Sequence, residues 1–167
     1  MTGPVADRPV MPGYGVVPAG EGSGLLPWAE AERRLAVSHD YWCATVRPDG
    51  RPHVMPVWGV WSTARLWFST GLGSRKARNL AADPRCALTT DDARDPVVLE
   101  GTAERVTEPD RIARFVAAVN QKYDAGMTVE FQDPEVNGTY AGRPERVFAL
   151  SGEDFIGSPT RWTFGSA

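Results

Sequence analysis

The sequence has few cysteines and few histidines, and both scarcities argue against a metalloprotein. Cys43 and Cys86 are its only cysteines, and their spacing does not match a metal-binding motif. Each stands in a hydrophobic run, which is typical of a buried free thiol in a reducing compartment. The only histidines, His39 and His53, have no cluster of Cys, Asp or Glu near them in the sequence. No metal site is therefore predicted.

The chain also has no long apolar run and no surplus of positive charge. No segment approaches the ~18 apolar residues of a membrane span, and the N-terminus has no apolar signal core. Its 18 basic residues are outnumbered by 21 acidic ones, for a net charge of −3. This balance argues against bulk attraction to nucleic acid or to an anionic membrane. We expect a cytoplasmic protein that binds neither nucleic acid nor membranes.

The length and composition suit one domain preceded by an irregular arm. The chain has 167 residues, of which 42% are hydrophobic, enough for one core. Ten of the first 24 residues are Gly or Pro, which is too many for a helix or a strand. We expect residues 1–24 to be an irregular N-terminal arm, dispensable for folding, and residues 25–167 to form the domain.

The rest of the chain reads mainly as strands. Pro48-Asp49-Gly50 carries the turn chemistry of a short hairpin. Helices are predicted after Pro27, over Ser74–Ala82, and after Thr107 as N-cap, whereas 124–143 reads as a polar connection. The predicted strands are Tyr41–Arg47, Arg51–Trp61, Arg65–Thr70, Cys86–Thr90, Val97–Val106, Arg146–Leu150 and Thr160–Phe164.

Short turns between the strands favour an antiparallel barrel over a doubly wound sheet. The predicted strand Arg51–Trp61 is apolar on both faces, which a strand with one wet side should not be. One face can fill a barrel, and the other can meet a partner subunit or a flat ligand.

The stretch STGLGSRKARNL, from Ser69 to Leu80, is rich in hydrogen-bond donors and has no acidic residue. The backbone N–H groups of Ser74, Arg75 and Lys76 are expected to be free at the start of a helix, where an anion binds well. The Ser74 hydroxyl and the cationic side chains add donors, with Lys76 expected to point into solvent and ligand. A capped surface helix with solvated cations explains the same spacing equally well.

A resemblance decides between these two interpretations. Trp67–Ala77, WFSTGLGSRKA, closely resembles the flavin-phosphate loop of the pyridoxamine 5′-phosphate oxidase-like split-barrel family. The preceding TVRPDGRPHVMPVW and the following VVLEGTAERV also resemble this family, so the resemblance spans roughly residues 25–164. It implies a six-stranded antiparallel split β-barrel, mainly β with a few helices, that forms a homodimer with a cofactor at each side of the interface.

The resemblance also implies which residues bind the cofactor. The family's strand along the flavin ring matches Met55, Pro56, Val57 and Trp58. Its contacts to the ribityl and phosphate groups match Ser69, Thr70, Ser74, Arg75 and Lys76, with Arg78 and Asn79 as weaker candidates. No catalytic residue is assigned, although Tyr123 and Tyr140 are conceivable proton donors.

Departures from the family pattern narrow the activity. Pro96 stands where true pyridoxamine phosphate oxidases have a Gln, and the C-terminal substrate motif is absent, so that oxidation is not expected. SRKARNLAADPR is more similar to the branch of flavin and deazaflavin oxidoreductases, many of which use coenzyme F-420. This similarity implies an oxidoreductase in which reduced F-420 delivers hydride to a small unsaturated acceptor. FMN, a non-catalytic carrier or sensor, and a haem-binding barrel with His53 as ligand remain alternatives.

Overall fold

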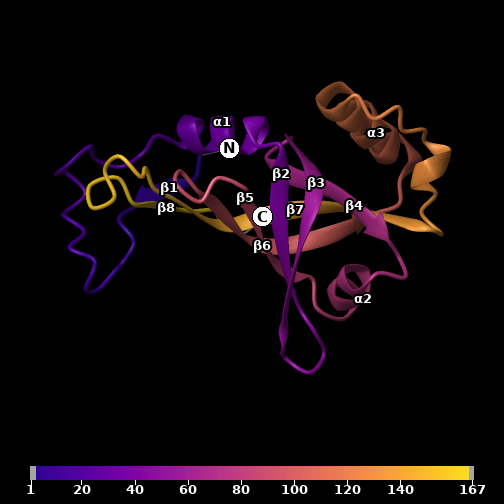
Figure 1. Ribbon diagram of the computed structural model, residues 1–167, viewed down its shortest axis with the longest axis horizontal. Helices are drawn as coiled ribbons and strands as arrows, with labels where there is room; N and C mark the ends of the chain where they lie inside the picture. The colour runs from indigo at the N-terminus through magenta and orange to yellow at the C-terminus, as the bar shows by residue number, and fades with distance from the viewer. Residues whose placement is uncertain (1–2, 166–167) are drawn as a thin grey trace.

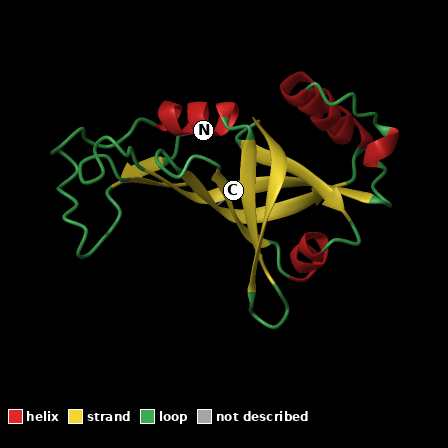
Figure 2. Ribbon diagram, viewed as in Figure 1, coloured by secondary structure: helices red, strands yellow, loops and turns green. Residues whose placement is uncertain are grey.

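The computed structural model describes residues 3–165, and Figure 2 shows strands at its centre with helices around them. The helices are α1 (Trp28–Val37), α2 (Arg75–Ala82), α3 (Pro109–Tyr123) and the short 3₁₀ helix η1 (Glu130–Gln132). The strands are β1 (Val5–Asp7), β2 (Asp40–Val46), β3 (Pro52–Ser62), β4 (Arg65–Gly71), β5 (Arg85–Thr90), β6 (Val97–Val106), β7 (Asn137–Ala149) and β8 (Thr160–Thr163). No helix within residues 3–165 has the length and apolarity to cross a bilayer.

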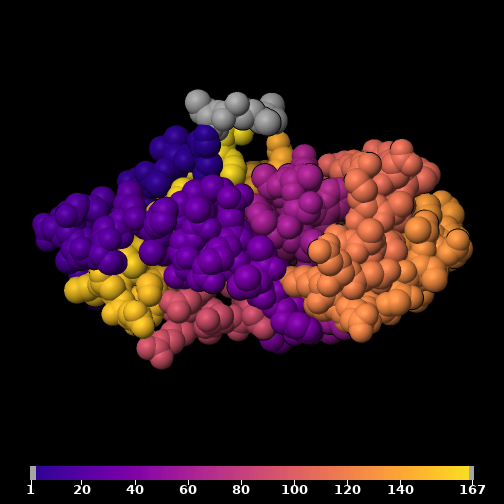
Figure 3. Space-filling model, turned by 90° about the horizontal axis from the view of Figure 1, so that it is seen from above, coloured from indigo at the N-terminus to yellow at the C-terminus, as the bar shows by residue number. Residues whose placement is uncertain are grey.

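Six strands close into an antiparallel barrel in the order β7, β4, β3, β2, β5, β6, with β6 pairing back to β7 (Figure 1). Strand β8 extends the sheet from β7, and β1 adds to β8. The predicted split-barrel fold is confirmed. Figure 3 shows the N-terminal arm at one end of the molecule and α3 near the other.

The hairpin of β2 and β3 follows the predicted turn. Gly50 has a φ of +83°, the left-handed conformation that the turn requires. Thr45 pairs with His53 and Cys43 with Met55, so these four side chains share one face of the hairpin. Toward its tip the hairpin projects beyond the barrel beside α2 (Figure 1). The inner face of the hairpin therefore continues from the core to the surface next to α2.

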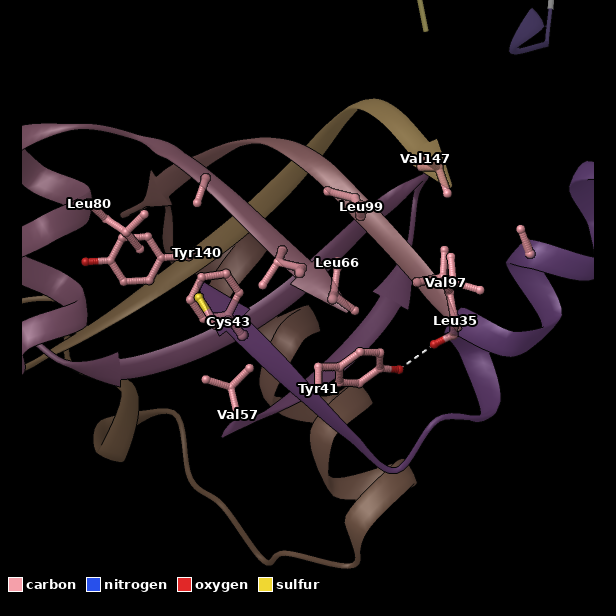
Figure 4. Packing of buried hydrophobic residues seen from close by; sticks show 14 of the residues in the cluster. Leu35, Tyr41, Cys43, Val57, Leu66, Leu80, Val97, Leu99, Tyr140 and Val147 are labelled. Atoms are coloured by element: carbon pink, nitrogen blue, oxygen red, sulfur yellow. Dashed lines mark hydrogen bonds between the residues drawn. The ribbon is translucent and has the colours of Figure 1, made fainter. Parts of the chain in front are cut away.

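The barrel interior is filled with apolar side chains from every barrel strand, several of which Figure 4 shows. Tyr41, Leu66 and Val147 are fully buried, and Trp162 of β8 is only 1% exposed. Both cysteines are free thiols, as predicted, with Cys43 buried and Cys86 partly buried. Burial raises the pKa of both thiols to about 12, so neither is a ready nucleophile.

Strand β7 is much longer than predicted. It begins at Asn137, inside the segment expected to be a polar connection. Gly138 and Gly142 hide the strand in the sequence, because glycines interrupt the alternation of side chains. A Cβ at Gly142 would lie 2.5 Å from Leu88, so this strand needs glycine where it crosses the packed interior. The predicted cap of α3 is also wrong: the N-cap is Glu108, not Thr107.

The expectation of an arm without a strand is wrong for Val5–Asp7. This segment pairs with Arg161–Thr163 of β8 as strand β1. The Arg8 guanidinium donates to the carbonyl oxygens of Pro159, at 2.6 Å, and Pro18, at 3.3 Å. The Val17 N–H donates to the Ile156 carbonyl. The arm is therefore hydrogen-bonded to the segment between β7 and β8 despite its glycines and prolines.

Deleting residues 1–24 should lower the melting temperature while leaving a folded barrel. The deletion removes the β1–β8 pairing but takes nothing from the core cluster of residues 31–162. We expect a fall of roughly 5 °C, since each kcal/mol shifts the midpoint by about 2–4 °C at this size. Thermal unfolding followed by circular dichroism measures it. Equal melting temperatures for both chains would show that the contacts of the arm contribute nothing.

Candidate functional site

The loop from β4 to α2 is ordered by hydroxyl groups. Ser74 is the N-cap of α2, and its Oγ accepts from the Ala77 N–H at 3.1 Å. The Thr70 hydroxyl also donates to Ser74 Oγ at 3.1 Å. Because Ser74 Oγ accepts both hydrogen bonds, its own hydrogen remains available for another acceptor. This geometry confirms the predicted helix start and positions one hydroxyl donor at it.

The backbone donors of this loop differ from the prediction at one residue. The Ser74 N–H is not free, because it donates to the Gly71 carbonyl oxygen at 2.9 Å. Arg75 and Lys76 follow as the first residues of α2, whose N–H groups have no carbonyl partner within the helix. Two backbone donors, rather than three, are available at the positive end of the helix.

Lys76 is less exposed than predicted. Its residue is only 8% exposed, because α2 packs against β2 and β4 and turns this side chain toward the hairpin. Among residues 3–165, its amine forms no hydrogen bond or ion pair with another side chain. The stem of this side chain is packed, whereas its amine keeps access to the surface, where its charge can meet an anion. Arg75, in contrast, is exposed.

Two residues of the hairpin face these cations. Thr45 is tied to α2 by a hydrogen bond of 3.0 Å from the Asn79 amide, which fixes the helix against the inner face of the hairpin. His53 pairs with Thr45 on that face, and Arg47 follows two residues after Thr45. We call Arg47, His53, Arg75 and Lys76 the cationic cluster.

Burial and charge together act on His53. Desolvation lowers the pKa of the imidazole, and the positive charges of Arg47, Lys76 and Arg75 lower it further. His53 Nδ1 and Arg47 Nε are buried atoms without a hydrogen-bond partner. Unpaired buried polar atoms are rare in folded proteins and call for a missing partner. An acceptor placed within the cationic cluster would supply one.

The predicted ring-binding residues of β3 divide between its two faces. Val57 is buried in the barrel, whereas Met55 is 46% exposed where the hairpin leaves it. Pro56 and Trp58 lie on the outer face, and Trp58 is 48% exposed. The Trp58 ring stacks on Tyr123 of α3 with centroids 4.5 Å apart and planes only 4° apart. The outer face of β3 thus carries an aromatic stack with α3, whereas Met55 lies on the opposite face.

Lys122 and Tyr123 fasten α3 to β3. The Lys122 amine donates to the Tyr41 hydroxyl and to the Gly59 carbonyl, each at 2.8 Å. Burial lowers the pKa of this amine to about 8. The Tyr123 hydroxyl accepts from the Gly59 N–H and donates to the His39 carbonyl oxygen. Since its hydrogen is already used, Tyr123 holds the stack in place rather than offering a proton.

The other predicted residues are not all brought together. Ser69 accepts a hydrogen bond of 3.2 Å from Gln132 of η1. Arg78 lines a separate pocket of about 280 Å³ with Leu72 and Tyr140, on another side of α2. Asn79 is completely buried, so its side chain serves the contact between α2 and Thr45. Within residues 3–165 there is no group of three or more metal-ligating side chains.

Comparisons with known proteins identify the family of this chain. The sequence profile of pyridoxamine 5′-phosphate oxidase matches residues 28–150. The chain belongs to the pyridoxamine 5′-phosphate oxidase family. The predicted family is thus confirmed, and the matched range includes both the cationic cluster and the Trp58–Tyr123 stack. No curated protein is similar enough in sequence to give a match.

Solved structures share the fold of this family member. A conserved hypothetical protein from Mycobacterium tuberculosis is 26% identical, with a TM-score of 0.69 over 76% of this chain and 86% of that one. An F-420 reductase is 28% identical, with a TM-score of 0.58 over 70% and 94% of the two chains. A haem-binding protein from Mycobacterium smegmatis is 23% identical, with a TM-score of 0.60 over 80% and 62%. The last likeness shows the fold alone.

Sequence reasoning missed Arg47 and discounted His53 in this family member. Arg47 is not among the residues predicted from the sequence, and His53 enters the prediction as the ligand of the haem alternative. The sequence did contain a signal for these two residues. Once the turn is known, the alternate residues 43, 45, 47, 53 and 55 are expected on one face of the hairpin. What the sequence could not give is that α2 lies against that face.

Proposed function

We propose that this chain is an oxidoreductase that binds a flavin-type cofactor between two subunits, with F-420 as the preferred cofactor. The observation that carries the proposal is Lys76, which packs at the start of α2 beside Arg75 and Arg47 with no acidic partner among residues 3–165. An ion in this position is stabilised when a phosphate or similar anion occupies the cluster. The anionic cofactors of this fold supply one.

Each residue of the cluster has a proposed role toward that anion. Lys76 provides a point charge, and the Ser74 hydroxyl provides the hydrogen that its own contacts leave unused. Arg75 and Arg47 provide guanidinium forks, while the free backbone N–H groups at the start of α2 add dipolar donors. Thr70 and Asn79 position these groups rather than touching the cofactor.

The strand that leaves the cluster suits the cofactor ring. Met55 and Trp58 are each about half exposed on opposite faces of β3, and the ring would lie along the strand at residues 55–58. The bound deazaflavin or flavin supplies the redox chemistry, so the chain itself needs to hold, orient and shield the reacting groups. The Trp58–Tyr123 stack gives one rigid aromatic wall at which a flat unsaturated acceptor can pack.

F-420 is preferred over FMN because the cluster has more positive charge than one phosphate monoester needs. The charges that act on the pKa of His53 are those of Arg47, Lys76 and Arg75, and no acidic side chain is among them. The deazaflavin carries a phosphodiester and an oligoglutamate tail, which can use the additional charges. The similarity to an F-420 reductase at 28% identity supports this choice.

Raising the salt concentration should weaken F-420 binding more than FMN binding. The additional contacts of the anionic tail are exposed, and exposed charge pairs are screened within about 10 Å at 0.1 M salt. Isothermal titration of both cofactors at low and high salt measures the two slopes. Binding of FMN alone would establish FMN as the cofactor, and binding of neither cofactor would refute the proposed function.

A further inference from the structure

A second cavity, of about 260 Å³, lies between α3 and the hairpin that joins β3 to β4. We call it the α3 cavity. None of its lining residues belongs to the cationic cluster or to the Trp58–Tyr123 stack. Its lining includes the apolar residues Val60, Phe115 and Ala118, which we call the floor, and the basic residues Arg65, Arg111 and Arg114, which we call the rim. The proposed cofactor site leaves this cavity without a role.

The charge of the α3 cavity contrasts with that of the whole chain. The chain has a net charge of −3, yet no acidic residue lines the cavity. Arg111 pairs with Glu104 at 2.9 Å and with Glu108 at 3.2 Å, so its orientation is fixed from outside the cavity. Arg65 lies 3.6 Å from the same Glu104. Within residues 3–165, Arg114 forms no ion pair, which leaves its guanidinium fork available.

The walls of the cavity are held in defined positions. The Arg111 guanidinium lies 5.3 Å from the centre of the Trp67 ring, and the Trp67 indole donates to the Ser62 carbonyl at 3.1 Å. Thr63 and Ala64 form the two-residue loop between β3 and β4, and both have a φ of +54°, which a tight hairpin loop of this kind requires. The hairpin thereby fixes the position of Thr63, which lines the cavity.

We propose that the α3 cavity binds a small amphiphilic carboxylate of about the size of one aromatic ring. Its apolar body would rest on Val60, Phe115 and Ala118, where it replaces water on an apolar floor. Its carboxylate would be held by the guanidinium fork of Arg114, which matches two coplanar oxygen acceptors. The positive rim excludes a cation, and the apolar floor disfavours an inorganic anion. This inference is independent of the proposed function.

Benzoate is a suitable probe, and the indole N–H of Trp67 is a suitable reporter. The chain has six tryptophans, and a Trp67→Phe variant identifies the Trp67 signal in a proton–nitrogen correlation spectrum of labelled protein. We expect benzoate to shift that signal in a saturable way, while the signal of the buried Trp162 stays in place. Benzyl alcohol, which has the ring without the charge, should bind at least about tenfold more weakly.

Variants of the rim and the floor test the assignment. Arg114→Gln should raise the dissociation constant of benzoate at least about tenfold, because it removes the charged fork. Arg94→Gln is the control, since it removes an equal charge from an exposed arginine outside the cavity and should leave binding unchanged. Ala118→Leu should weaken binding of benzoate and benzyl alcohol alike by filling the floor.

Three results would overturn the inference. The first is the absence of any Trp67 shift with benzoate up to about 10 mM, the range in which a one-ring ligand should bind. The second is equal affinity for benzoate in Arg114→Gln and wild type. The third is a benzoate response that survives Arg114→Gln but disappears in Lys76→Ala, which would place the anion in the cationic cluster.

Discussion

Replacing Lys76 with alanine should weaken cofactor binding about tenfold to 150-fold, equivalent to about 1.5–3 kcal/mol for one charge-assisted contact. The physical reason is that the Lys76 amine lies inside the cationic cluster with no other anion to neutralise it. Isothermal titration with F-420 and with FMN measures the loss. Arg75→Ala should act in the same direction, and the double variant should lose less than the sum if both side chains reach one phosphate.

The burial of Lys76 requires a second variant. Alanine removes a packed side chain as well as a charge, so a loss of affinity could follow from a distorted α2. Lys76→Met keeps most of the apolar stem and should retain the melting temperature while still losing affinity. Arg78→Met is the matched control, because it removes a charge from the same helix at a different pocket. If Lys76→Met binds both cofactors as tightly as wild type, the cluster is not the cofactor site.

The sequence predicted the fold where its signals are local. The turn Pro48-Asp49-Gly50 and the alternation on either side of it fix β2 and β3 to within one residue of their observed ends. The Ser74 cap likewise marks the start of α2. In contrast, the predicted strand Arg146–Leu150 covers only the end of β7. Gly138 and Gly142 carry no side chains whose alternation would reveal the rest of the strand, although the packed barrel requires glycine there.

The candidate site was predictable only as a list of residues. The loop sequence indicates an anion site, but the burial of Lys76 depends on the packing of α2 against β2, which is a tertiary contact. The same packing brings Arg47 and His53, 28 and 22 residues before Arg75 by their numbers, to the start of the helix. Local patterns therefore identified the donors of one loop, and the fold added the hairpin residues opposite it.

A single Val54→Glu substitution should convert a dimer into a monomer. On the outer face of β2 and β3, Trp42, Val54 and Trp58 are 45%, 50% and 48% exposed. Trp42 pairs with Pro56, and Ala44 pairs with Val54, so these residues form one continuous apolar strip. A groove of about 560 Å³ runs on from it past Ala44 and Ala87. A strip of this kind on a soluble protein is typical of a surface that a partner covers.

Light scattering should give the wild type a mass of twice the 18.2 kDa of one chain, and Val54→Glu a mass near that of one chain. A carboxylate forced into an apolar interface costs several kcal/mol, so the dimer dissociation constant should rise at least about 100-fold. Val37→Glu places the same charge on a valine of α1 that is 65% exposed, more than Val54, and should leave the mass unchanged. Because the proposed site lies between subunits, cofactor affinity should fall with the dimer in Val54→Glu and persist in Val37→Glu. A wild type that is monomeric at every concentration, or a monomeric Val54→Glu with undiminished affinity, would show that one chain holds the cofactor alone.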